Sequence, residues 1–106
     1  MVKKIETYKE NGFNEITMSD YLVHDSPYMK VVSFNLKKDQ ELPIHSYDTD
    51  GQVCIIVIEG SGEFLKKDDA AILATKGDVL MSDISEPHGI RASSDMRVLA
   101  AIAPPV

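Results

Sequence analysis

The sequence has little that can crosslink it, coordinate metals through thiolates or anchor it in a membrane. Cys54 is the one cysteine among 106 residues, which excludes an internal disulfide and a zinc site built from several thiolates. The longest apolar runs, Val53–Ile58 and Val98–Ala103, have six residues each, whereas a membrane-spanning helix needs about 20. The residues after Lys3 and Lys4 lack the apolar core of a secretion signal. We therefore expect a cytoplasmic protein, with no membrane partner, that is stabilised by packing alone.

Positive charge is also scarce. The formal net charge is −6, from 17 acidic and 11 basic residues, and the basic residues do not gather into a stripe. We therefore expect no nucleic-acid partner, because the chain as a whole repels phosphate. Six of the acids lie between Asp39 and Leu65, where there is no Lys or Arg. These acids are interpreted as solvated loop carboxylates, with attraction of a cation as the alternative.

The apolar segments are short, rich in Val, Ile, Phe and Tyr, and separated by turn residues, which favours strands throughout. In the first 25 residues a short helix and an edge strand fit equally well. We predict one domain over residues 1–106, with an N-terminal arm at 1–27 and a barrel at 28–103. The predicted strands are Tyr28–Leu36, Glu41–Ser46, Gln52–Glu59, Gly62–Lys66, Ala70–Thr75, Asp78–Ser82, Gly89–Ala92 and Met96–Ala103.

About eight short strands at intervals of roughly ten residues indicate an all-β sandwich or closed barrel. Two of them, in Val53–Ile58 and Val98–Ala103, are apolar on both faces. A strand that has one face in the interior and the other in water does not need this composition. We therefore expect the second face to meet another subunit, with a symmetric homodimer as the default.

Two histidines lie at corresponding places in two strand–turn segments. His88 follows Gly77 by eleven positions, and His45 is followed by Tyr47 and later by Gly60, which bounds a hairpin. These features resemble the cupin family over roughly residues 31–103. The resemblance implies an all-β, cupin-type jelly-roll β-barrel, also called a double-stranded β-helix.

The chain departs from the family pattern in the first motif, where the family has a second histidine and then a carboxylate. Tyr47 stands where that histidine is expected. Counting onward from Tyr47 makes Gln52 the stand-in for the carboxylate, whereas counting back from Gly60 reaches Val53. The loop residues Asp48 and Asp50 offer a carboxylate only if the loop folds inward.

The resemblance implies a pocket at one mouth of the barrel. We expect His45, Tyr47, Gln52 and His88 to face each other there, with Met81 as a further lining residue. A divalent Fe, Mn, Ni or Zn ion would use His45 and His88, with Gln52 or Tyr47 as a further ligand. Each histidine taken alone also fits a hydrogen-bonded structural role. The sequence leaves two functions open: a barrel that binds a small molecule, or a metal-dependent dioxygenase, isomerase or decarboxylase. The incomplete ligand set favours the first.

Overall fold

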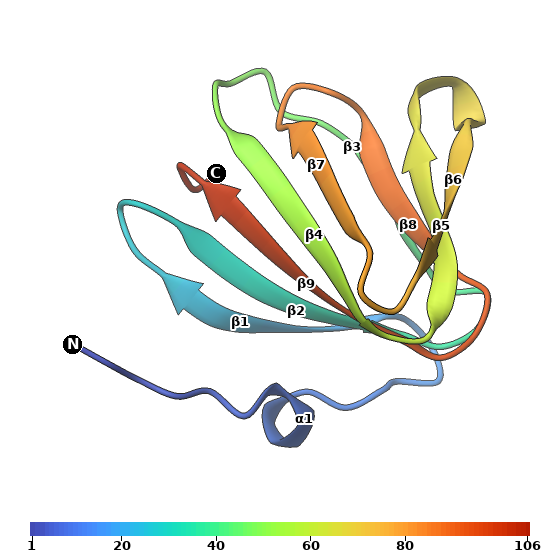
Figure 1. The fold of residues 1–106 in the computed structure, drawn as a ribbon, viewed down its shortest axis with the longest axis horizontal. Helices are drawn as coiled ribbons and strands as arrows, with labels where there is room; N and C mark the ends of the chain where they lie inside the picture. The colour runs from blue at the N-terminus through green and yellow to red at the C-terminus, as the bar shows by residue number, and fades with distance from the viewer.

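The computed structural model describes residues 1–106, apart from the side chain of residue 69. The strands form two antiparallel sheets (Figure 1). One sheet has the order β1-β2-β9-β4-β7 and the other the order β3-β8-β5-β6. The elements are α1 (Thr7–Glu10), β1 (Ser19–Asp25), β2 (Lys30–Leu36), β3 (Glu41–His45), β4 (Gln52–Glu59), β5 (Ser61–Lys66), η1 (Lys67–Asp69), β6 (Ala71–Thr75), β7 (Val79–Asp83), β8 (His88–Ala92) and β9 (Met96–Ala103).

The all-β prediction is confirmed, and each predicted strand differs from the observed one by no more than two residues at either end. The barrel begins earlier than the boundary predicted at residue 28. β1 pairs with β2 along an antiparallel register that runs from Ser19↔Asn35 to Asp25↔Lys30. The first 25 residues thus contain both alternatives that the sequence allowed, a short helix and an edge strand.

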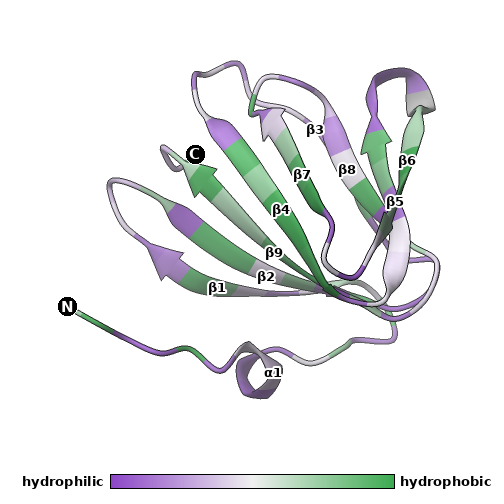
Figure 2. Cartoon of the chain, viewed as in Figure 1, coloured by the Kyte–Doolittle hydropathy of each residue, from purple (hydrophilic) through white to green (hydrophobic). Residues whose placement is uncertain are grey.

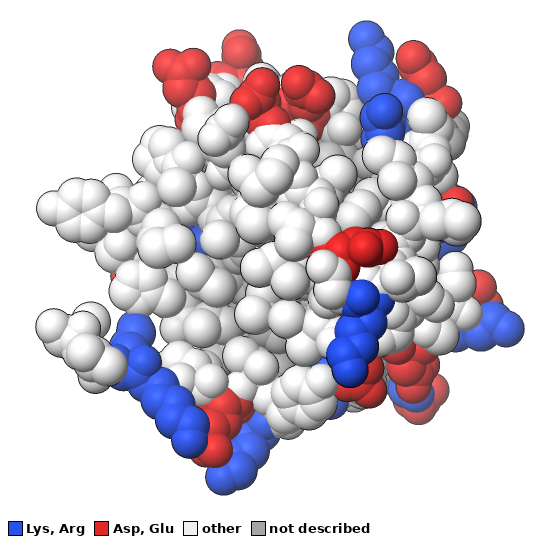
Figure 3. All heavy atoms as spheres, viewed as in Figure 1, with Lys and Arg blue, Asp and Glu red and all other residues white. Residues whose placement is uncertain are grey.

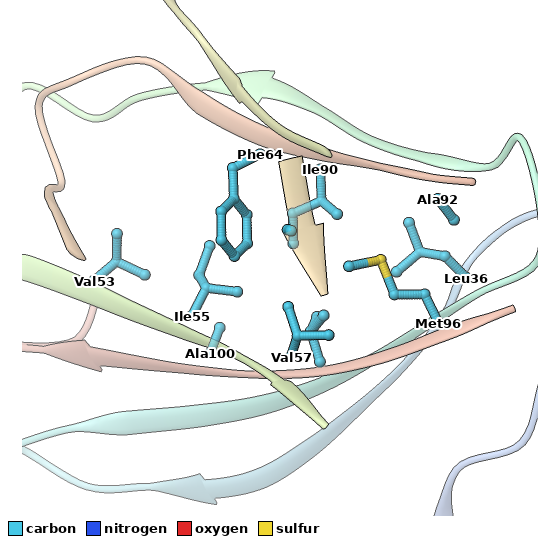
Figure 4. Close-up of a cluster of buried hydrophobic side chains, with 11 residues drawn as sticks. Leu36, Val53, Ile55, Val57, Phe64, Ile90, Ala92, Met96 and Ala100 are labelled. Atoms are coloured by element: carbon cyan, nitrogen blue, oxygen red, sulfur yellow. The ribbon is translucent and has the colours of Figure 1, made fainter. Parts of the chain in front are cut away.

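The core lies between the two sheets (Figure 4). In β4 and along most of β9 it is built by alternation of buried and partly buried positions, as strand geometry requires. In β4 the side chains of Val53, Ile55 and Val57 are buried, and those of the residues between them are only partly buried. Phe64 and Ile90 of the second sheet belong to the same buried cluster.

The outward face of the five-stranded sheet is also apolar, and Figure 2 shows hydrophobic colouring along most of β4. The register aligns Val79, Ile56, Leu99, Ser33 and Tyr21 in one row across this face. A second row consists of Met81, Cys54, Ala101, Val31 and His24. Neither row contains an Asp, Glu, Lys or Arg residue. We call these ten residues the outer-sheet face.

The N-terminal segment lies beside the five-stranded sheet (Figure 1), where the buried Asn11 bonds to β1 and β2 and an arginine of β9 makes further contacts. The Arg97 guanidinium carbon lies 4.0 Å from the Tyr8 ring centroid and 4.8 Å from that of Phe13. Its Nη1 donates to the Asn11 carbonyl at 3.2 Å. The Tyr8 hydroxyl in turn donates to Glu59 at 2.6 Å. These contacts fix residues 8–13 against the barrel, and Val2 beyond them is fully exposed.

The charged side chains lie mainly around the rim of the face seen in Figure 3, with acidic ones gathered along its upper edge. The loop between β3 and β4 runs along the same edge in Figure 1. Asp48 and Asp50 of this loop are both exposed. No helix in the part of the chain that the structure describes is long and apolar enough to cross a membrane.

Candidate functional site

A cavity of about 70 Å³ opens between the two sheets at one end of the barrel. It widens outward into a larger hollow, which shares Phe34, Leu42, His45 and Tyr47 with it and adds Lys30 and other residues at its rim. Apolar side chains make up most of its wall: Phe34, Leu42, Val53, Ile55, Ile84, Ala100, Ile102 and Val106. The polar side chains that line it are His45, Tyr47 and His88.

Strand pairing brings the two histidines together. His45 ends β3 and His88 begins β8, and the two residues are direct cross-strand partners. Their ring centroids are 4.6 Å apart, with an angle of 56° between the ring planes. The register shifts between Leu42 and His45, and such an irregularity changes the direction in which a side chain points.

Gly89 permits this close approach. A Cβ atom at position 89 would lie 2.6 Å from the Leu42 carbonyl oxygen and 2.9 Å from the Ile44 nitrogen. Backbone atoms of β3 therefore occupy the space that a side chain would need. The glycine directly after His88 thus sets the distance between the two strands that carry the imidazoles.

Both imidazoles are oriented by the backbone in the same way. His45 Nδ1 lies 2.9 Å from the Pro43 carbonyl oxygen, and His88 Nδ1 lies 2.7 Å from that of Glu86. A carbonyl oxygen can only accept a hydrogen bond, so each Nδ1 must carry the proton. In the neutral ring, Nε2 is then a bare acceptor.

His88 is held in its neutral form. Its residue is only 6% exposed, and burial lowers the pKa of the imidazole below its ordinary value of 6.5. The hydrogen bond to the Glu86 carbonyl opposes this shift in the pKa, whereas the nearby charge of a protonated His45 adds to it.

Tyr47 lies at the mouth of the cavity and is 52% exposed. Its ring meets that of His45 edge to face, with centroids 6.0 Å apart and an interplanar angle of 78°. The Tyr47 backbone nitrogen donates to the Ile84 carbonyl at 3.1 Å, which ties the two loops at this end of the barrel together. The structure thus brings His45, Tyr47 and His88 to one cavity.

Gln52 and Met81 lie elsewhere. Gln52 is on the outward side of β4, where its Nε2 is 3.4 Å from Asp83 Oδ1. The neighbouring Val53 points inward instead, is 4% exposed and lines the cavity. Met81 is 59% exposed on the outer-sheet face, because it pairs with Cys54 in the register of β7 with β4. It borders a separate groove between β7 and β6, which His88 also reaches.

Sequence reasoning did not assign several wall residues to the cavity, and Ile84 and Val106 were the least expected of them. Ile84 is buried although it lies in the polar turn after β7, and an isolated apolar residue among turn residues was the available signal. Val106 comes from the tail after β9, and Lys30 Nζ lies 3.4 Å from its backbone oxygen. No local pattern in the sequence indicates that this tail returns to the cavity.

Solved structures identify the family. A crystal structure of an RmlC-like cupin protein from Desulfovibrio desulfuricans is 44% identical in sequence over 100% of both chains, with a TM-score of 0.96. The chain belongs to the cupin family. A protein of Klebsiella pneumoniae with a double-stranded β-helix domain shares the fold at 18% identity, covering 98% of this cupin and 91% of that chain, with a TM-score of 0.89. No family model and no curated protein matches the sequence.

Cupin barrels often bind a metal. Whether this cupin can do so depends on which metal-coordinating atoms line the cavity. His45 and His88 supply two nitrogen ligands, but the third inward position beside them is the hydrocarbon of Val53. Among the described residues, no three His, Cys, Asp or Glu side chains come close enough together to hold an ion. A tightly bound divalent ion needs three or four protein ligands. The side chains present therefore do not fit a tightly held metal.

Proposed function

We propose that this cupin binds a small organic molecule in the cavity between its sheets. The observation that carries the proposal is the composition of the wall, in which eight apolar residues surround three convergent polar ones. Binding sites for small molecules are typically concave and apolar, with a few polar groups that fix the orientation of the ligand. Because the cavity has too few metal ligands, we expect its own side chains, and not a bound metal, to hold the organic molecule.

The cavity volume limits the part of the ligand that enters. A dry apolar cavity of about 150 Å³ is known to hold benzene, so about 70 Å³ admits only part of one small ring, and the remainder extends into the hollow outside. Burial of each CH₂ group of such a ligand contributes about 0.8 kcal/mol. We therefore expect weak to moderate affinity from the apolar part alone.

Two neighbouring alanines of β9 provide a matched test. Ala100 is buried and lines the cavity, whereas Ala101 lies on the outer-sheet face. A methyl-resolved NMR screen with small cyclic compounds should shift the signals of Val53 and Ile84, which line the wall. Ala100→Val should abolish these shifts because the added methyl groups fill the cavity, and Ala101→Val should preserve them. Shifts that are unaffected by Ala100→Val would place the binding elsewhere and refute the proposal.

One observation favours a metal-dependent function as the second candidate. Metal-ligating histidines almost always donate their other ring nitrogen to a carboxylate, a backbone carbonyl or water, and both Nδ1 atoms here lie beside backbone carbonyls. On this candidate His45 and His88 hold a divalent Fe, Mn, Ni or Zn ion, and Tyr47 is the remaining protein donor at the mouth. With two nitrogens the ion would bind weakly and exchange readily.

Elemental analysis distinguishes the two candidates. Untagged protein purified without chelators should contain well under one metal ion per chain if the first candidate is correct. A near-stoichiometric metal that disappears in His88→Ala would favour the second. His24→Ala is the matched control, because His24 is part of the outer-sheet face and does not line the cavity.

We further infer that two copies of this cupin pair through the outer-sheet face. A chain with a net charge of −6 approaches a second copy most easily through a surface without carboxylates. The outer-sheet face crosses all five strands and holds no charged residue, and Asn11 of the N-terminal segment covers one of its members, Ser33. The apolar composition of the face is typical of homodimer interfaces, which are more apolar than the remaining surface.

We keep the cytoplasm as the proposed location.

Light scattering during size-exclusion chromatography tests the pairing. The protein should elute with twice the chain mass of 11.7 kDa, and Leu99→Lys should convert it to the monomer because it places a charge in the centre of the face. Leu73→Lys is the matched control, since Leu73 is 82% exposed on β6 of the other sheet. A monomeric native protein, or a dimer that survives Leu99→Lys, would refute this interface.

A further inference from the structure

The hydrogen bonds at the two imidazoles determine which chemical groups the cavity can satisfy. Each Nδ1 lies beside a backbone carbonyl, at 2.9 Å for His45 and 2.7 Å for His88. The proton on each neutral ring is therefore on Nδ1, and each Nε2 has only a lone pair. Among the described residues neither Nε2 has a hydrogen-bond partner. Neither Nε2 is among the nitrogen and oxygen atoms of the described side chains that are both buried and unpaired. Both Nε2 atoms are therefore accessible from outside the protein.

The remainder of the wall offers few donors. Eight of the eleven lining side chains are hydrocarbon, and Tyr47 contributes a hydroxyl at the mouth. No Lys or Arg lines the inner cavity, and Lys30 lies only at the rim of the outer hollow. A carboxylate or phosphate that entered would thus meet two lone pairs and hydrocarbon. Burying an anion without donors is costly.

We infer that the cavity selects an apolar molecule that carries two hydroxyl groups on neighbouring carbon atoms. This inference rests on the proposed function and adds the ligand class. The two rings are cross-strand partners with centroids 4.6 Å apart, and both line the same cavity, so one small ligand can contact both. Each hydroxyl donates to one Nε2. The ring or chain that bears the two hydroxyls contacts the apolar side chains of the wall, among them Val53 and Ile84.

Selectivity follows from the cost of leaving an acceptor without a donor. A site built to hydrogen-bond a hydroxyl strongly rejects the analogue that lacks it, because the buried acceptor stays unpaired. A ligand with one hydroxyl leaves one Nε2 unpaired, and one with neither hydroxyl leaves both. The expected order of affinity is catechol, then phenol, then 1,2-dimethoxybenzene. Benzoate, which has the same ring and a negative charge, should bind no better than 1,2-dimethoxybenzene.

The experiment is an NMR titration of the full chain with these four compounds, under nitrogen, with EDTA present. A pH near 8 keeps ordinary imidazoles, whose pKa is about 6.5, in the neutral form. We expect catechol to bind at least tenfold more tightly than 1,2-dimethoxybenzene, with shifts at cavity methyl groups. His88→Leu should lower the affinity for catechol to about that for phenol, since one acceptor is gone. The matched control His24→Leu should leave the whole series unchanged.

The outcomes separate this inference from the proposed function. If 1,2-dimethoxybenzene or benzoate binds in the cavity as tightly as catechol, the inference is overturned and the proposed function stands. If catechol binds only when EDTA is replaced by a divalent metal, the inference is also overturned, because the metal and not the imidazole pair recognises the hydroxyls. If none of the four compounds shifts a cavity signal, both the inference and binding of a single-ring molecule fail. If His88→Leu fails to fold, the affinities of the four compounds for the native chain still test the inference.

Discussion

Val53→Glu tests whether one added carboxylate allows the cavity to hold a divalent metal tightly. Val53 lines the cavity beside His45 and His88 and is 4% exposed. A glutamate here adds an inward carboxylate and so completes a set of two imidazoles and one carboxylate, a combination that binds divalent transition metals. Without metal, the buried carboxylate should lower the free energy of unfolding by about 3 kcal/mol.

Metal should reverse this loss. A ligand present at 1,000 times its dissociation constant stabilises the folded state by about 4.1 kcal/mol. For a domain of this size, each kcal/mol shifts Tm by roughly 4–8 °C. Millimolar zinc should therefore raise the Tm of Val53→Glu by about 15 °C or more if the new site binds with micromolar affinity. The native chain should gain less than about 0.5 kcal/mol if its two histidines bind zinc with a dissociation constant near 1 mM.

The assay is differential scanning calorimetry with and without zinc. Gln52→Glu is the matched control, since Gln52 is the preceding residue and lies on the outward side of β4. Its Tm should respond to zinc as the native chain does. A Val53→Glu variant that shows no zinc-dependent rise in Tm would refute the cavity geometry. A larger zinc response in Gln52→Glu than in Val53→Glu would show that the register of β4 is wrong.

Three further predictions concern stability. Gly89→Ala should lower the free energy of unfolding in urea by about 1–3 kcal/mol, because its Cβ would lie 2.6 Å from the Leu42 carbonyl oxygen; a variant as stable as the native chain would contradict this contact. Arg97→Met should cost about 1–2 kcal/mol and speed hydrogen exchange in the N-terminal segment, because the guanidinium no longer contacts the Tyr8 ring; unchanged exchange would show that other contacts hold the segment. The folded state lowers the pKa of His88, so its contribution to stability is complete above the unfolded pKa of about 6.5 and is lost as pH falls through the folded pKa. The urea midpoint should thus fall less between pH 8 and pH 5 in His88→Gln than in the native chain, and equal falls would contradict this assignment.

The strands were predictable because their signals are local. Short apolar runs, such as those within Gln52–Glu59 and Met96–Ala103, mark the strands, and glycines and aspartates mark the turns between them. The interval from Gly77 to His88 was also visible in the chain, and the resemblance to the cupin family grouped His88 with His45, its strand partner in the structure. The strand signals depend on neighbouring residues alone, whereas the grouping of the two histidines depended on that resemblance.

The remaining features of the site depend on loop conformation, which the number of residues between two motif positions does not determine. The loop before β4 allowed either Gln52 or Val53 to point inward. In the structure Gly51 adopts a φ of +132°, and a Cβ there would lie 2.6 Å from Ile84 Cδ1. That tight turn determines which residue faces inward, and a shift of one residue exchanges the two faces of a strand. Val106 was unpredictable for a related reason, since its place depends on how the tail after β9 returns.

The matching carbonyl contacts at His45 and His88 have a consequence for how the pocket can change over evolution or in the laboratory. Each ring is hydrogen-bonded to a backbone carbonyl two residues before it, at Pro43 and Glu86, and not to any hydrocarbon side chain of the wall. The surrounding wall can thus be replaced residue by residue without reorienting the polar pair. A library that varies only Ile84, Ala100 and other hydrocarbon positions would sample new ligand shapes around an unchanged recognition element.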